Sequence, residues 1–162
     1  ILTFFEKLAI RISNLPIVLN QKSYLIASKI NSKTKLMSAF IPPINVEILE
    51  DQLQFKIDFL KDSTDYIFCT NAYSLVYDKN GNEIYGILPL INIFNNNPKL
   101  GLILSDPKGE YLNYFSSNNS ILNDNIAILN KNHSFFEVIK QTDCLIRNTS
   151  MDGDSLSINE AL

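Results

Sequence analysis

Apolar residues recur along the chain with two spacings, one typical of amphipathic helices and one typical of buried strands. The helical spacing predicts helices at residues 1–12, 21–30, 46–60, 83–94, 110–115 and 134–141. Short continuous apolar runs predict strands at residues 16–19, 35–40, 66–70, 99–104, 126–129 and 143–147. We expect Pro89 to kink the helix that contains it, and Ser134 with Glu137 to cap the helix at residues 134–141.

Two adjacent prolines, Pro42 and Pro43, divide the chain. Because proline continues neither a helix nor a central strand, we place a domain boundary there, with residues 1–43 ending one domain and residues 44–162 forming the next. In the second part strands alternate with helices, which predicts the α/β class, with a Rossmann-like parallel sheet and flanking helices. The chain starts at Ile1 and stops in the first turn of a predicted helix, so we expect a fragment truncated at its carboxyl terminus.

Composition excludes several classes of function. Hydrophobic residues make up 46% and charged residues 19% of the chain, as in soluble globular proteins. A net charge of -3 gives no reason to expect nucleic-acid binding, and no apolar run is long enough to span a membrane. Cys69 and Cys144 lack metal spacing and are interpreted as buried apolar residues of a reduced, cytoplasmic protein. The single histidine, His133, is expected to face solvent without a Ser, Cys or metal partner, and no metal site is predicted.

The segment after the last predicted strand carries the candidate chemistry. It is a polar loop with one glycine followed by the start of a helix, and ligands of open parallel sheets bind beyond such strand ends. Free backbone N–H groups at a helix start suit a phosphate or a sugar hydroxyl. Two acids, Asp152 and Glu160, flank this loop with seven residues between them.

This pattern resembles the large group 1 family of retaining glycosyltransferases with the GT-B fold, whose signature is an acid, seven residues, then Glu-Ala. It is most similar to bacterial surface-polysaccharide members that read Arg-Pro-Thr, a short gap, Asp-Gly-Asp, then Ser and Glu-Ala-Leu. Residues 39–43 resemble the interdomain linker of that family, and Tyr85-Gly86 resembles the start of its first crossover helix. The resemblance covers residues 15–162, and the residues matching its terminal motif are Arg147, Thr149, Asp152, Gly153, Asp154, Ser155, Ser157, Glu160, Ala161 and Leu162.

The resemblance implies a role for each matching residue. Glu160 would accept hydrogen bonds from the two ribose hydroxyls of a nucleotide-sugar, since a carboxylate accepts from a vicinal diol at two points. Asp152 would hold the transferred sugar, and the amides around Gly153 would contact sugar and diphosphate without a metal or cofactor. The implied catalytic residues are Asp152 and Arg147, and the implied donor-binding residues are Glu160, Gly153, Asp154, Ser155, Leu156 and Lys108.

The chain departs from the family at two places. Asn148 stands where the family has proline, which stiffens the loop. The segments at residues 70–72 and 84–86 lack the Arg and Lys that clamp the diphosphate, so Arg147 and Lys108 are the candidate substitutes.

Structural roles remain open for the same residues. Ser157 with Glu160 forms a capping-box sequence, Asp152 could begin a turn, and Asp154 could be loop scaffolding. Arg147 could pair with Asp154 or Asp143, and Tyr85 could pack on the sheet.

The implied function is transfer of a sugar, with retained anomeric configuration, from a nucleotide-diphosphate donor to a saccharide or lipid-linked acceptor in bacterial polysaccharide or glycoconjugate biosynthesis. A cytoplasmic location follows, with the inner face of the membrane as an alternative reached through missing regions. A nucleotide-sugar epimerase of the same fold and a non-catalytic doubly wound binding module stay open as alternatives. As an isolated fragment we expect the chain to be inactive.

Overall fold

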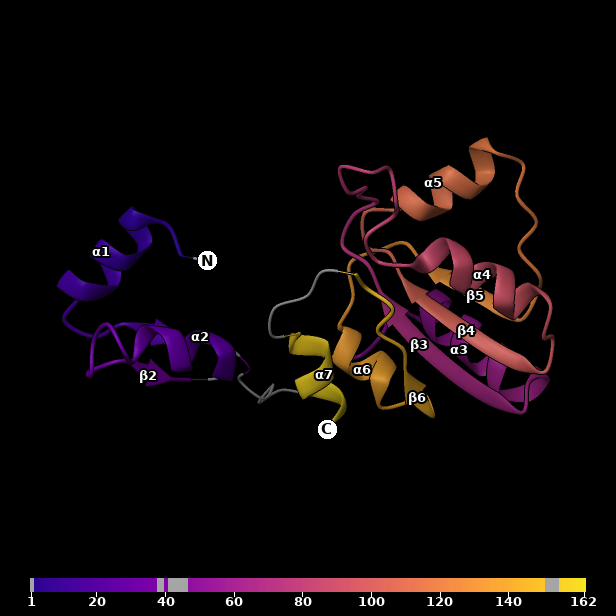
Figure 1. The fold of residues 1–162 in the computed structure, drawn as a ribbon. Coiled ribbons are helices and arrows are strands. Elements are labelled where there is room, and N and C mark those ends of the chain that lie inside the picture. Colours follow the sequence, from indigo (N-terminus) through magenta and orange to yellow (C-terminus); the bar gives the residue numbers. More distant parts are fainter. Residues whose placement is uncertain (1, 38–39, 41–46, 151–154) are drawn as a thin grey trace. The chain divides into compact units, whose positions relative to one another are not determined.

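The structure, a computed structural model, describes residues 2–37, 40, 47–150 and 155–162. The chain divides into two compact units (Figure 1). Unit 1 comprises Ile1–Pro42 and Gly153–Leu156, and unit 2 comprises Pro43–Asp152 and Ser157–Leu162. In the described part of the chain, no helix is long and apolar enough to cross a membrane.

Unit 1 alternates two helices with two short strands. Its elements in chain order are α1 (Phe4–Ile12), β1 (Ile17–Val18), α2 (Gln21–Ala27) and β2 (Lys35–Leu36), and the two strands pair in parallel. Thr3 and Glu6 form a capping box that begins α1. The Asn31 side chain donates to the backbone carbonyls of Ile10 and Ser13, which fastens the end of α1 to the segment after α2. Of the strand predicted at residues 35–40, the described part contains only β2.

Unit 2 is an α/β fold with a four-stranded parallel sheet in the order β5-β4-β3-β6, so the predicted fold class is confirmed at that level. Figure 1 shows α4 in front of this sheet and α3 behind it. The elements in chain order are α3 (Asp51–Ser63), β3 (Tyr66–Asn71), α4 (Ile87–Asn95), β4 (Leu100–Ser105), α5 (Glu110–Ser117), β5 (Ile126–Leu129), α6 (Phe135–Ile139), β6 (Cys144–Leu145) and α7 (Leu156–Ala161), of which residues 157–161 belong to this unit.

Strand alternation creates an apolar core on each face of the sheet. Leu102 and Leu104 of β4 pack with α4 and α5, whereas Ile103 packs on the opposite face with α3 and Val138 of α6. Each of these four side chains is completely buried. Strands buried on both faces are largely apolar, which is why the continuous apolar runs predicted β3, β4 and β5 well.

Several helices and strands begin or end at other residues than the sequence predicted. The helix predicted at residues 46–60 begins at Asp51, and the strand predicted at residues 143–147 is reduced to Cys144–Leu145. The helix predicted at residues 83–94 begins only at Ile87. Pro89 therefore lies in the first turn of α4, where its missing N–H interrupts no hydrogen bond, and the helix runs unbroken through it.

Two side-chain predictions are also corrected. Ser134 occupies the N-cap of α6 but makes no side-chain capping bond, and Glu137 instead pairs with Lys140 at 2.9 Å. Cys69 is buried as predicted, but Cys144 is exposed because it lies on the edge strand β6.

One face of α3 is buried and the other is exposed, so shortening a side chain should affect stability differently on the two faces. Ile57 is completely buried, whereas Phe55 is 71% exposed. We expect Ile57→Ala to lower the free energy of unfolding by about 2–5 kcal/mol, because it leaves a cavity in the core. Phe55→Ala should change it by less than about 0.5 kcal/mol. Urea unfolding followed by circular dichroism measures both, and equal losses in the two variants would contradict this assignment of faces.

Candidate functional site

The strand order places a topological switch point between β3 and β6. The chain runs from β3 to β4 to β5 along one side of the sheet, then returns to the other side of β3 as β6. All four strands are parallel, so the segments that follow them emerge at the same edge. In open sheets of this kind the connections diverge where the order reverses, and ligands bind in the resulting crevice. The carboxyl ends of β3 and β6 are therefore the candidate site.

Arg147 lies at this switch point. It lies two residues after the end of β6, and its Nη1 donates to the Asn71 side chain at 2.9 Å and to the Asn71 carbonyl at 3.2 Å. Its guanidinium lies 6.0 Å from the centre of the Tyr85 ring, and Tyr85 packs against the core as the packing interpretation expected. Asp143, one of the two acids considered as a partner of Arg147, accepts from the Ile67 amide at 2.7 Å. Arg147 thus connects the end of β6 to the end of β3.

Lys108 reaches the same segment from the other side. It follows β4, and its ammonium lies 3.0 Å from Ser74 Oγ and 4.1 Å from the centre of the Tyr73 ring. Tyr73 and Ser74 lie two and three residues after the end of β3, which lies between β4 and β6 in the sheet. Lys108 and Arg147, the two substitutes proposed for the missing basic clamp, therefore flank the segment that follows β3.

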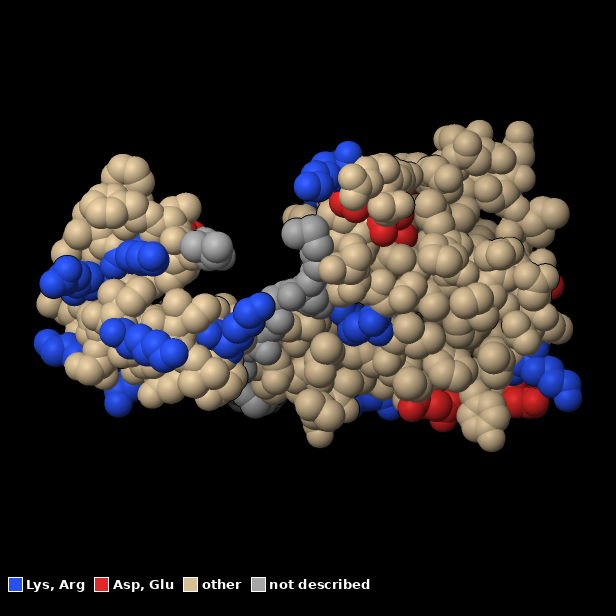
Figure 2. Space-filling model, viewed as in Figure 1, with Lys and Arg blue, Asp and Glu red and all other residues tan. Residues whose placement is uncertain are grey.

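Cations at the switch point matter for anion binding because charge is unevenly distributed between the two parts of the chain. Residues 1–42 contain six Lys or Arg and one acid, whereas residues 43–162 contain eight Lys or Arg and sixteen acids. Figure 2 shows basic side chains gathered over unit 1 and acidic groups on unit 2. A net formal charge of -8 in residues 43–162 opposes binding of an anion. An anionic ligand at the switch point therefore needs Arg147 and Lys108.

The loop after β6 is fastened to the start of α4. The Asn148 side chain donates to the Gly86 carbonyl at 3.0 Å, and the Ser150 amide donates to the Ile84 carbonyl at 2.9 Å. Gly86 has φ of +65°, and a Cβ there would collide with Asn148. Asn148 thus restrains the loop after β6 by hydrogen bonding to the start of α4.

Two carboxylates that the sequence did not reveal accept hydrogen bonds from the N-terminal amides of α4 and α5, the helices on one face of the sheet. Glu83 accepts from the amides of Ile87 at 2.6 Å and Leu88 at 3.3 Å at the start of α4, and from the Tyr111 hydroxyl at 2.6 Å. Asp106, completely buried, accepts from three amides in the first turn of α5. Desolvation raises the pKa of Asp106, although these amides act in the opposite direction. The donors at both helix starts are therefore already used.

The matched residues at the end of the chain are placed only in part. Asp152, Gly153 and Asp154 lie outside the described residues, so their separation from Glu160 is not among the described distances. Glu160 is half-buried in α7, and desolvation raises its pKa. The helix begins at Leu156, which places Ser157 inside it rather than at its cap, so the capping-box interpretation of Glu160 is wrong.

The donor-binding candidates beside α7 differ in exposure. Ser155, directly before the helix, is buried, whereas Leu156 is half-exposed. Leu156 offers its backbone amide at the first helical position, where no intrahelical acceptor exists.

His133 contradicts the expectation of a solvent-facing residue without partners. It is half-buried, its Nε2 lies 2.9 Å from Ser105 Oγ, and its Nδ1 lies 2.6 Å from the Lys131 carbonyl. The carbonyl requires a proton on Nδ1, so Nε2 accepts from the serine hydroxyl. This geometry is that of a serine with a histidine base and an orienting group. Because Ser105 is only 4% exposed, the pair serves to hold the loop after β5 against the end of β4.

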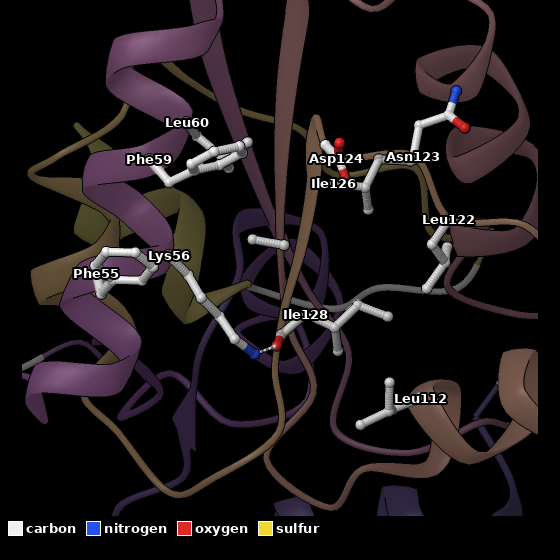
Figure 3. A pocket seen from close by; sticks show the side chains of 11 residues that line it. Phe55, Lys56, Phe59, Leu60, Leu112, Leu122, Asn123, Asp124, Ile126 and Ile128 are labelled. Carbon is white, nitrogen blue, oxygen red and sulfur yellow. Dashed lines mark hydrogen bonds between the residues drawn. The ribbon is translucent and has the colours of Figure 1, made fainter.

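In the described part of the chain, no group of three or more His, Cys, Asp or Glu side chains comes together. The cleft drawn in Figure 3 lies along the outer edge of β5, separated from the switch point by β4.

No protein-family model matches the chain, and a search of curated proteins finds no match either. Topology, charge and hydrogen bonding are therefore the observations on which a function for this chain depends.

The contact between Gly86 and Asn148 predicts a strong difference between two glycines. Both have positive φ, but a Cβ at Gly81 would meet nothing within 4 Å. Gly81→Ala should cost about 1–2 kcal/mol of unfolding free energy from backbone strain alone. Gly86→Ala should cost about 1–3 kcal/mol more, because the β6 loop must move. Urea unfolding measures both, and equal losses would mean that the loop accommodates the new methyl group.

Burial of His133 predicts a pH dependence of stability. Desolvation lowers its pKa below the usual 6.5, so the unfolded chain takes up the proton first as the pH falls. The stabilisation is complete above about pH 6.5 and decreases as the pH falls from there toward the lower folded pKa. Since the chain has one histidine, His133→Gln should flatten the unfolding free energy between pH 7.5 and 5.5. A wild-type stability that stays constant or rises on acidification would exclude the buried neutral state.

Proposed function

We propose that residues 44–162 form the nucleotide-sugar donor-binding domain of a retaining glycosyltransferase with the GT-B fold. The reaction is transfer of a sugar from a nucleotide diphosphate to a saccharide or lipid-linked acceptor. The observation that carries this proposal is the position of Arg147 and Lys108, which flank the segment after β3 at the switch point of a parallel sheet.

Charge neutralisation of the leaving group is the chemistry these two cations supply. Bond cleavage at the sugar leaves negative charge on the nucleotide diphosphate, and fixed cations stabilise that charge in the transition state. The planar guanidinium of Arg147 can bind two phosphate oxygens at once, whereas the Lys108 ammonium acts as a point charge. Asn71 holds the guanidinium in place before the donor binds.

Glu160 supplies the second element of the proposal. Its carboxylate, half-buried in α7, would accept from both ribose hydroxyls. Only the ionised form accepts at both oxygens, and desolvation raises the pKa of Glu160. Donor binding should therefore weaken as the pH falls through the pKa of this group. Asp152, with Gly153 and Asp154, keeps its proposed role toward the transferred sugar.

A non-catalytic nucleotide-binding module of the same fold is the second candidate. The observation favouring it is that Glu83 and Asp106 occupy the N-termini of α4 and α5, which leaves fewer backbone donors for a diphosphate. In that case nucleotide diphosphates bind, but no sugar is transferred by the full-length protein with any acceptor.

Calorimetric titration with UDP, GDP, ADP and dTDP tests the proposed site. Arg147→Met and Glu160→Ala should each weaken binding of the preferred nucleotide by about 1–3 kcal/mol, the scale of hydrogen bonds to charged groups. Lys108→Met should also weaken binding, but less than Arg147→Met, because it removes a single point charge.

Lys99→Met is the matched control, since Lys99 is an exposed cation whose nearest carboxylate, that of Asp65, lies 3.9 Å away near the opposite end of β3. It should leave nucleotide affinity unchanged. Equal losses from Lys99→Met and Arg147→Met would show a non-specific charge effect. Unchanged affinity in both Arg147→Met and Glu160→Ala would refute the site.

A further inference from the structure

A shallow apolar cleft runs along the outer edge of the sheet, away from the switch point. Its volume is about 440 Å³, within the range of small-molecule sites. One wall comes from α3, the floor is strand β5, and the other wall comes from α5 and the segment before β5 (Figure 3). Its main apolar side chains are Phe55, Phe59, Leu112, Leu122, Ile126 and Ile128.

Lys56 places a cation on the floor of this cleft. Figure 3 shows its side chain extending from α3 toward β5, and its ammonium donates to the Ile128 carbonyl at 2.7 Å. The remaining protons of the ammonium can be donated to a ligand, since this carbonyl is its only acceptor in the described part of the chain.

Lys56 is not paired as its neighbours are, although the acid Asp124 also lines the cleft, on the wall that precedes β5. Within residues 2–37, 47–150 and 155–162 it forms no ion pair, whereas Lys61 on the same helix pairs with Asp58 at 3.7 Å and Lys131 pairs with Glu50 at 2.9 Å. Desolvation, and then the nearby charge of Lys131, lower the pKa of Lys56. An anion in the cleft would compensate this charge.

The hydrogen bond from Lys56 to the Ile128 carbonyl argues against a peptide strand as the occupant of the cleft. Strand β5 ends the sheet, and an added strand would need the outward carbonyls of that edge. Lys56 already occupies the Ile128 carbonyl, a device by which proteins protect sheet edges from pairing. A small molecule that needs the cation and the apolar walls, but not the backbone, fits these contacts.

We propose that this cleft binds a medium-chain fatty carboxylate, with the carboxylate on Lys56 and the aliphatic chain against the phenylalanine and leucine walls. The proposal is independent of sugar transfer, because the cleft and the switch point lie at different parts of the sheet. Two features of this ligand match the cleft. Its single negatively charged head group suits Lys56, and its flexible apolar tail suits the walls.

Calorimetric titration of the full chain with decanoate, decanol and butyrate, each below its aggregation limit, distinguishes the contribution of the charged head group to affinity from that of the aliphatic chain. Decanoate should bind at least ten-fold more tightly than decanol, which lacks the charge, and than butyrate, which lacks the chain. Lys56→Met should weaken decanoate binding at least ten-fold, and Lys56→Arg should restore most of it. Lys61→Met, on the same helix but outside the cleft, should leave it unchanged.

Thermal unfolding of each variant establishes that it is folded before titration. Equal affinity for decanoate in the wild type and Lys56→Met would overturn the proposal, as would equal binding of decanol and decanoate. Sedimentation of the wild type tests whether a second copy of the chain occupies the cleft instead. A dimer that decanoate does not dissociate, and that a charge on the exposed wall in Phe55→Lys abolishes, would assign the cleft to a second copy and overturn the proposal.

Discussion

The reversal of strand order around β3 is the constraint on which the rest of unit 2 depends. Because β4 and β6 lie on opposite sides of β3 and all run parallel, three strand ends meet at one edge. Lys108 and Arg147, far apart in the sequence, then approach the same short segment from both sides. Without the return of the chain to the far side of β3, Arg147 could not reach Asn71, and no basic pair would exist there.

The polar groups at this edge stabilise the fold and limit what it can bind. Glu83 and Asp106 satisfy the amides that begin α4 and α5, and the Tyr111 hydroxyl joins them by donating to Glu83. A carboxylate that holds a helix start removes those donors from any ligand. An anion at the switch point therefore depends on side-chain cations, in a unit whose formal charge is strongly negative.

Two edges of the same sheet present different chemistry for a simple reason. At the carboxyl edge the strands end, so polar residues such as Asn71 and Ser105 follow apolar runs and meet one another. Along the outer side of β5, where no strand of the described sheet pairs with it, the walls of the cleft are apolar and Lys56 supplies the polar contact. The proposed donor site and the proposed carboxylate site follow from this difference.

By itself, the sequence determined the α/β class and the positions of the buried strands, because strands covered on both faces are largely apolar. Residues 126–129, for example, are buried at every position of β5. It misplaced the start of α4, because Glu83 does not lie in the helix: it forms a backbone bridge with Tyr77, and its side chain accepts from the first amide of the helix. Only the tertiary structure paired His133 with Ser105 and Arg147 with Asn71, since strand order and register decide which distant side chains meet.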